Sequence, residues 1–142
     1  MVRFKHRFIV ATVAASPENM AELEPKKILT MLRESIATNF GDCGSGSTSS
    51  SLQVRSFDPA SGVCVIRTGK EYYRMVRASL TLLSGTKDAR LSVTVQGVAG
   101  CDRTLKAAAM EAYTRGYLRA GIDQEDAAAL LLRQQQLLEV LH

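Results

Sequence analysis

The chain has 142 residues and a mass of 15.5 kDa, and 46% of its residues are hydrophobic while 23% are charged. A chain of this size and composition builds one hydrophobic core without disulfides or a structural metal. No stretch approaches the ~20 apolar residues that cross a bilayer, so no membrane span is expected. The net charge of +4 and the isoelectric point near 9.1 favour a polyanionic partner.

The positive charge is unevenly distributed along the chain. Every Lys and Arg except Arg133 lies within residues 1–120, whereas residues 121–142 are acidic overall. The basic N-terminus is followed by only a short apolar stretch at residues 8–15, which a Ser-Pro-Glu turn closes. No signal peptide or other targeting segment is therefore expected.

Residue types that support catalysis or metal binding are few. The cysteines, Cys43, Cys64 and Cys101, are odd in number and have no C-x-x-C spacing, which predicts isolated thiols in a reducing compartment. Apart from His142 at the end of the chain, a nucleophile–base pair would have to use His6, which lies among cations that disfavour its charged form. We expect neither catalytic residues nor a metal site.

The hydrophobic pattern predicts four strands and four helices. In chain order these are a strand at residues 2–15, a helix at 25–40, a hairpin of strands at 52–57 and 63–67, a helix at 69–84, a strand at 90–98, a helix after Gly100 and a last helix at 123–141. The Gly/Ser/Thr tract at 44–51 is expected to be a flexible loop. Thr68 and Glu71 match a capping box for the second helix, and Gly116 is expected to interrupt or end the third.

The order of the first six elements is the split βαβ, or ferredoxin-like, plan of α+β proteins. It implies one antiparallel sheet with two helices on one face and additional C-terminal helices. Residues 1–121 are expected to form the ferredoxin-like domain. Residues 122–142 are expected to be either a further helix of that domain or a helix that docks on a partner. Either the C-terminal helices or a partner protein would cover the second face of the sheet.

The first strand begins with basic residues on alternate positions. Arg3, Lys5 and Arg7 point to one side, and His6 lies between them on the other. Three cations within ~14 Å of strand can span two or three phosphates of a nucleic-acid backbone. The alternative is a strand end that its charge merely keeps soluble.

The second helix carries a further basic stripe. Lys70, Arg74 and Arg77 share an exposed face, and Arg67 lies just before the helix. A stripe of this kind is often a solvated helix surface. Together with the first strand, it indicates a continuous basic surface.

A Gly-rich bend at residues 97–100 precedes the third helix, whose first turn holds Arg103. Backbone amides in such a place can cradle a phosphate. The bend has KH-like G-x-x-G spacing, but it follows a strand instead of joining two helices. The strand at 62–67 lacks the aromatic residues on which RNA-recognition motifs stack bases. Residues 95–98 are similar to part of the acylphosphatase phosphate loop, but Cys101 stands where that family needs an Arg.

Three blocks of the sequence carry a family resemblance. They are residues 1–8 (MVRFKHRF), residues 62–67 (GVCVIR) with 70–73 (KEYY), Val76 and 78–80, and residues 98–100 with Arg103-Thr104 and 113–115. In this order, over about residues 1–115, they resemble the Pop-five family, the small protein subunit of ribonuclease P and ribonuclease MRP. The chain departs from the family at Cys101-Asp102, in the Ser-rich tract at 45–51, and in its leucine-rich C-terminal helix.

The resemblance implies a non-catalytic, RNA-binding subunit of the ribonuclease P and/or MRP ribonucleoprotein, which supports removal of the 5′ leader from precursor tRNA and/or processing of precursor rRNA. The catalyst would be RNA, with Mg2+ on that RNA and no cofactor on the protein. Its partners would be the catalytic RNA and other protein subunits, in the nucleus or nucleolus if the source is eukaryotic. The residues expected to bind RNA are Arg3, Lys5, His6, Arg7, Arg67, Lys70, Arg74 and Arg103. The alternative is a ferredoxin-like protein-interaction module that assembles a complex without contacting RNA.

Overall fold

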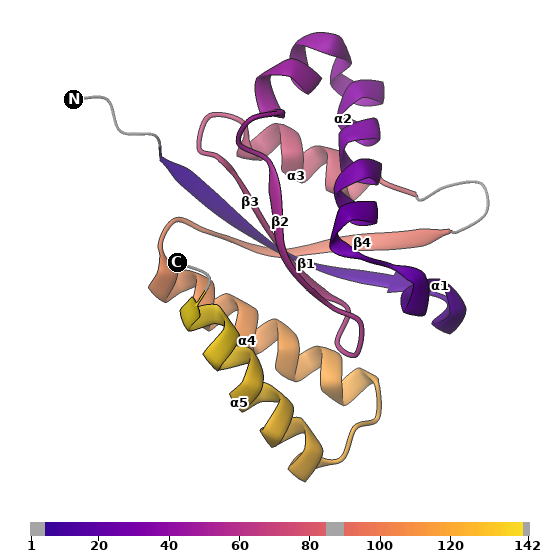
Figure 1. The fold of residues 1–142 in the computed structure, drawn as a ribbon, viewed down its shortest axis with the longest axis vertical. Helices are drawn as coiled ribbons and strands as arrows, with labels where there is room; N and C mark the ends of the chain where they lie inside the picture. The colour runs from indigo at the N-terminus through magenta and orange to yellow at the C-terminus, as the bar shows by residue number, and fades with distance from the viewer. Residues whose placement is uncertain (1–4, 85–89, 141–142) are drawn as a thin grey trace.

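A four-stranded antiparallel sheet organises the chain (Figure 1). The structure is a computed structural model, and it describes residues 5–84 and 90–140. Its elements are β1 (His6–Ala15), α1 (Pro17–Glu22), α2 (Pro25–Thr48), β2 (Gln53–Asp58), β3 (Val63–Gly69), α3 (Tyr73–Leu82), β4 (Leu91–Ala99), α4 (Asp102–Arg119) and α5 (Gln124–Val140). No helix within these ranges combines the length and the apolar character that crossing a membrane demands.

The strand order in the sheet is β2-β3-β1-β4, and every neighbouring pair is antiparallel. This is the predicted ferredoxin-like arrangement, and the fold class is confirmed. The two inner strands, β1 and β3, contain unbroken buried runs, Ile9-Val10-Ala11 and Val63-Cys64-Val65-Ile66. Successive residues of a strand point to opposite faces, so an unbroken buried run means that both faces of the sheet are covered.

Two pairs of helices cover the two faces of the sheet (Figure 1). Ile9, Cys64 and Ile66 pack with residues of α2 and α3 in one cluster. Val10, Val63 and other residues of the opposite face pack with α4 and with Leu138 of α5 in a second cluster. The C-terminal helices therefore cover the second face, which answers the question that the sequence left open.

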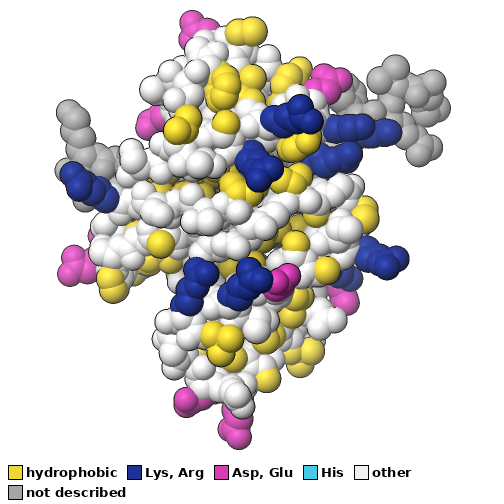
Figure 2. Space-filling view, turned by 180° about the vertical axis from the view of Figure 1, so that it is seen from behind, with side chains coloured by type: hydrophobic (Ala, Val, Ile, Leu, Met, Phe, Trp, Pro, Cys, Tyr) yellow, Lys and Arg dark blue, Asp and Glu magenta, His cyan; other side chains and the backbone are white. Residues whose placement is uncertain are grey.

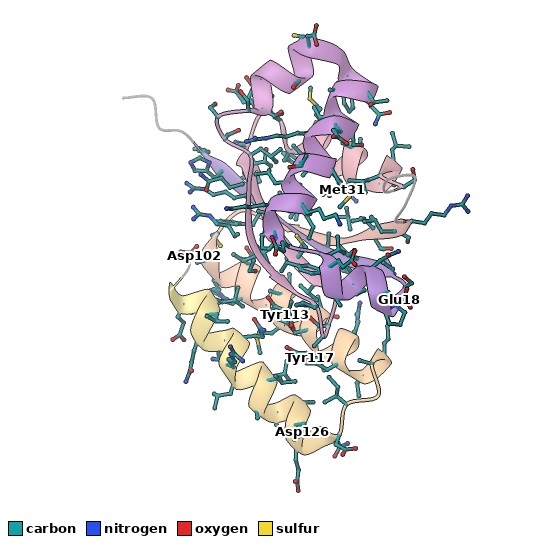
Figure 3. All side chains as sticks on the ribbon, turned by 45° about the vertical axis from the view of Figure 1, so that its right-hand side comes forward. Glu18, Met31, Asp102, Tyr113, Tyr117 and Asp126 are labelled. Carbon is teal, nitrogen blue, oxygen red and sulfur yellow. The ribbon has the colours of Figure 1, made fainter. Side chains whose placement is uncertain are left out.

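Tyr117 joins α4 to the turn of the β2–β3 hairpin. Its hydroxyl donates a hydrogen bond of 2.6 Å to Asp58 Oδ2, and Ser61 Oγ donates one of 2.9 Å to the same oxygen. Burial and then the hydrogen bond to Asp58 raise the pKa of Tyr117 above its ordinary value. Tyr113 stacks one turn earlier, with ring centroids 6.3 Å apart, and both rings point from α4 toward the sheet (Figure 3). The hairpin tip is thus fixed to α4.

The prediction that Gly116 interrupts or ends its helix is wrong, because α4 continues through it to Arg119. The glycine is required by a close approach: a Cβ built there would lie 2.7 Å from Ser61 Cβ and 2.9 Å from Ser61 Cα. The absence of a side chain lets α4 lie directly on the hairpin turn.

The tract at residues 44–51 is mostly helical, so the prediction of a flexible loop is wrong. Gly41, at φ +71°, interrupts α2, and the chain then resumes a helix that ends at Thr48. Thr48 Oγ1 donates to the Gly44 carbonyl and Ser47 Oγ donates to the Cys43 carbonyl. These hydroxyl groups are satisfied within the helix, and the buried Gly44 and Thr48 anchor the segment. The composition of the tract does not reveal these hydrogen bonds or the burial of Gly44 and Thr48.

Two further details of the sequence prediction are corrected. Thr68 does not cap a helix, because β3 runs to Gly69 and Thr68 pairs with Arg7 of β1; α3 begins only at Tyr73, without a side-chain cap. The predicted turn after β1 is the short helix α1, in which Ser16 Oγ accepts a hydrogen bond of 3.4 Å from the Asn19 N–H.

The contact between α4 and the hairpin predicts that Gly116→Ala destabilises the protein. Alanine gains about 1 kcal/mol of helix propensity, but the overlap with Ser61 costs about 1–3 kcal/mol. We expect a net loss of up to about 2 kcal/mol in the free energy of unfolding, measured by urea denaturation. Gly46→Ala is the control, because a Cβ there meets no atom within 4 Å, and it should leave stability unchanged or higher. Equal effects of the two substitutions would contradict this account.

Candidate nucleic-acid interface

The N-terminal end of β1 brings together basic residues from several elements. The ladder between β1 and β3 continues past His6, because the Lys70 backbone N–H donates a 2.9 Å hydrogen bond to the Lys5 carbonyl. Lys5 and Lys70 are both exposed. Two lysines predicted to bind RNA, far apart in the sequence, are therefore held side by side by the backbone.

Strand alternation distributes these residues over both faces of the sheet. Arg7 lies on the same face of the sheet as Ile9, the face that α2 and α3 cover, whereas His6 lies on the same face as Val10, which α4 and α5 cover. We call Lys5, Arg7, Lys70, Tyr73, Arg74 and Arg77 the α3-side group, and His6, Arg55 and Arg67 the α4-side group. Six of the eight residues predicted to bind RNA thus fall into these two groups.

The α3-side group is a cluster of cations around one tyrosine. Arg74 Nε donates a 3.3 Å hydrogen bond to the Tyr73 hydroxyl, and its guanidinium lies 5.8 Å from the ring centroid. That hydrogen bond, followed by the charges of Arg74, Arg7 and Arg77, lowers the pKa of Tyr73. Figure 2 shows Lys and Arg side chains gathered over α3 and the start of β1, at the upper right. The surface is suited to an anion.

Arg7 is held in place at the end of β4. Its Nη1 donates a 3.2 Å hydrogen bond to the His6 carbonyl, and its guanidinium lies over Gly100, where an added Cβ would come within 3.2 Å of Arg7 Cζ. The Gly-rich bend predicted as a phosphate cradle thus makes room for an arginine. The first turn of α4 there is capped internally, because Thr104 Oγ1 accepts a 3.4 Å hydrogen bond from the Cys101 N–H.

The α4-side group comes from three adjacent strands. Burial first, and then the charges of Arg67 and Arg55, lower the pKa of His6 below 6.5. His6 Nδ1, Arg55 Nε and Arg67 Nε are all buried atoms without a hydrogen-bond partner. The three side chains therefore form a positively charged, under-satisfied cluster.

The sequence analysis missed Arg55. It lies where the pairing of β2 with β3 shifts register between Val54 and Ser56, and it is near enough to His6 for its charge to lower the pKa of that ring. The sequence shows that Arg55 is a charged residue within a predicted strand, next to positions that pair with apolar residues of β3. It does not show the irregular pairing at Arg55. Arg103 is exposed in the first turn of α4, and Arg3 lies outside the described residues.

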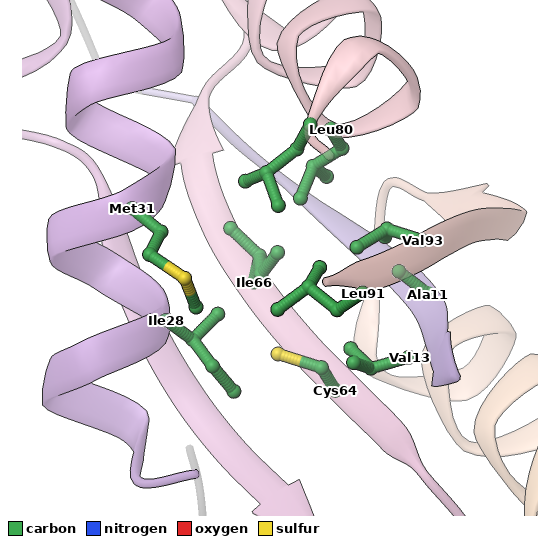
Figure 4. Close-up of a pocket in the computed structure, with 10 residues that line it drawn as sticks. Ala11, Val13, Ile28, Met31, Cys64, Ile66, Leu80, Leu91 and Val93 are labelled. Carbon is green, nitrogen blue, oxygen red and sulfur yellow. The ribbon is translucent and has the colours of Figure 1, made fainter. Parts of the chain in front are cut away.

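Cys64 and a small cavity lie in the core between the sheet and the helices α2 and α3. Cys64 lies in an apolar cavity of about 10 Å³ between the sheet, α2 and α3 (Figure 4), a space for at most one water molecule. Burial raises the pKa of this thiol to about 12, so it stays protonated. Within residues 5–84 and 90–140, no three His, Cys, Asp or Glu side chains are grouped to hold a metal ion.

The charges of the α4-side group lead to a prediction about the pKa of His6. NMR should give His6 a pKa below 6.5, and Arg67→Gln should raise it because one repelling charge is removed. Folding disfavours the protonated ring, so the stability that His6 contributes is present above pH 6.5 and is lost as the pH falls. Arg33→Gln, on the exposed surface of α2, is the control and should leave the pKa unchanged. A His6 pKa insensitive to Arg67→Gln would refute the proximity of the two side chains.

Comparison with known proteins places these observations in a family. The family model described as "Rpp14/Pop5 family" matches residues 7–110. The chain is 30% identical over 119 residues to an Arabidopsis thaliana protein named "Probable ribonuclease P/MRP protein subunit POP5", covering 78% of each chain. It is 28% identical to the Schizosaccharomyces pombe ribonuclease P/MRP protein subunit POP5, covering 78% of this chain and 87% of that one. The bovine subunit of that name is 32% identical over 62% of this chain and 52% of its own length.

The fold also matches a solved structure. A chain in a cryo-EM structure of yeast ribonuclease MRP superposes with a TM-score of 0.59, at 12% sequence identity, over 72% of this chain and 79% of that chain. At this identity the likeness concerns the fold alone. The family model, in contrast, extends from Arg7 of β1 into α4 and so includes the whole sheet except His6. The resemblance predicted from the sequence is confirmed, and this chain belongs to the Rpp14/Pop5 family.

Proposed function

We propose that this protein is an RNA-binding, non-catalytic subunit of ribonuclease P and/or ribonuclease MRP. The names of its relatives support membership of that particle. The observation that carries the RNA-binding part is the α3-side group, in which Lys5, Arg7 and Arg74 are gathered at one end of the sheet. The proposed catalyst is the RNA, together with Mg2+ that the RNA itself binds.

The proposed contact is with the RNA backbone. Clustered Lys and Arg side chains neutralise phosphates and release counterions, so binding depends on salt more than on sequence. Tyr73 offers one aromatic ring within the α3-side group, but its hydroxyl is already bonded to Arg74. The inner strand β3 has no aromatic residue to stack on bases. This composition supports recognition of RNA shape and charge over reading of bases.

The biological role follows from the particle. The protein would let catalytic RNA and its substrate approach each other, supporting removal of the 5′ leader from precursor tRNA and/or processing of precursor rRNA. Its partners would be the catalytic RNA and other protein subunits, in the nucleus or nucleolus. Arg3, Arg103 and the α4-side group remain candidate RNA contacts.

The C-terminal helices support a second, compatible role. We propose that residues 122–142 belong to the domain formed by residues 1–121, because Leu138 is buried in its second core. The outer surface of α4 and α5 leaves large side chains uncovered: Leu118 is 65%, Leu132 59% and Leu137 47% exposed. Such side chains favour contact with another protein subunit. A module that used this surface and no RNA is the competing function.

The α3-side group predicts the salt dependence of RNA binding. Replacing Lys5, Arg7 and Arg74 together with Gln should weaken binding of a structured RNA. It should also reduce the slope of log K against log salt concentration by about 0.7–0.9 for each phosphate that the protein no longer neutralises. Fluorescence anisotropy over a salt series from about 50 to 300 mM measures both quantities.

A matched variant separates a local interface from general charge. Lys26, Lys27 and Arg33 are exposed on α2, which starts beyond the opposite end of β1. Their replacement with Gln removes the same charge and should leave the slope nearly unchanged. Equal reductions of affinity in the two triple variants would reject a defined interface. Absence of salt-sensitive binding by the unaltered protein, together with copurification of proteins alone, would favour the interaction module.

A further inference from the structure

The α4-side group occupies one face of three neighbouring strands. His6 of β1 and Arg67 of β3 are diagonal neighbours, because His6 pairs with Gly69 and Phe8 pairs with Arg67. Side chains in this relation have their Cβ atoms about 7–8 Å apart, a spacing that an arginine side chain bridges. Arg55, from the irregular part of β2, joins them, because its charge and that of Arg67 both act on the His6 ring. Residues far apart in sequence thus converge on one point.

The polar atoms at this point lack partners. Arg55 Nε, Arg67 Nε and His6 Nδ1 are each buried and have no hydrogen bond. Buried polar atoms are almost always paired, and an unpaired N–H lowers stability unless a ligand or water satisfies it. Here two unpaired N–H groups belong to permanently charged side chains, which also repel each other. A ligand that accepts hydrogen bonds and carries negative charge relieves both defects.

We propose that Arg55, Arg67 and His6 form a binding site for one backbone phosphate of RNA, on the face of the sheet opposite the α3-side group. A guanidinium presents Nε and one Nη as a fork that matches two oxygens of a phosphate. Two guanidinium groups and an imidazole would supply more hydrogen-bond donors to a single phosphodiester than one lysine does. This inference deepens the proposed function and rests on it.

RNA is the partner that the position favours. His6 is flanked in sequence by Lys5 and Arg7, whose side chains lie on the α3 side, so the two groups share one strand end. A nucleic-acid backbone carries phosphates at regular intervals and is able to supply one to each group as it passes around that end. An isolated carboxylate of a partner protein would satisfy only the α4-side group. RNA bound to both groups would instead hold the end of β1 from both faces of the sheet.

NMR of the Arg Nε–H groups in the full chain tests the site directly. Three probes are added separately at moderate salt: a mixed-sequence RNA hairpin, inorganic phosphate and a polyglutamate peptide. The RNA should shift the Arg55 and Arg67 signals at concentrations at which the peptide has no effect. A shift produced by phosphate or by the peptide, but not by RNA, would overturn the assignment to RNA.

Lysine substitutions separate a phosphate fork from simple charge. Arg55→Lys and Arg67→Lys keep the charge but lose the two-pronged geometry, and each should weaken RNA binding about tenfold, the effect of one charge-assisted hydrogen bond. Arg33→Lys, on the exposed surface of α2, is the control and should change affinity by less than about threefold, because it lies in neither group and keeps its charge. Circular dichroism of each variant checks that it is folded. The NMR experiment uses the unaltered protein and so does not depend on the folding of any variant.

The outcomes distinguish this inference from the proposed function. If RNA binds with the expected salt dependence, but the lysine variants bind like the unaltered protein and the Nε–H signals stay fixed, the α4-side site is wrong and the RNA-binding function stands. If the unaltered protein shows no salt-sensitive RNA binding, both are overturned.

Discussion

The position of β1 as an inner strand, hydrogen-bonded on both edges and buried on both faces, is the constraint on which the other features depend. It pairs with β3 over seven residues and with β4 over eight, and its central residues supply both hydrophobic clusters. Because side chains alternate along a strand, the same geometry that fills two cores sends the residues at its basic end to two surfaces. The basic end of β1 thus continues the same alternation of side chains, beyond the part of the strand that the helices cover.

The helical layers decide where that pattern changes from apolar to charged. α2 and α3 cover one face, α4 and α5 the other, and the strand end beyond them carries Lys5, His6 and Arg7. Charges placed under a helix would have to be paired or neutralised. At the strand end they stay available to a partner, and Arg7 is positioned by backbone contacts at His6 and Gly100. The position of Arg7 at this strand end is therefore fixed by contacts within the chain itself.

Much of this arrangement follows from the sequence, because periodicity and turn residues report local structure directly. The strand predicted up to residue 15 and the hairpin predicted at 52–67 correspond to β1 from His6 onward and to β2 and β3. Features set by tertiary contact were missed. The helical segment before Thr48 depends on burial against α3, the glycine at position 116 on the approach of Ser61, and the position of Arg55 relative to β3 on a register shift. None of these leaves a periodic signal.

The covering of the second sheet face by the last third of the chain has a consequence for biosynthesis. β1 emerges from the ribosome well before its neighbours β3 and β4, and α4 comes later still. Until α4 docks, Val10, Val63 and Val65 present an apolar surface to solvent, the type of surface on which chaperones and aggregation act. A nascent chain of this topology thus keeps the second face of its sheet exposed until α4 and α5 have been synthesised and Leu138 packs into the second cluster.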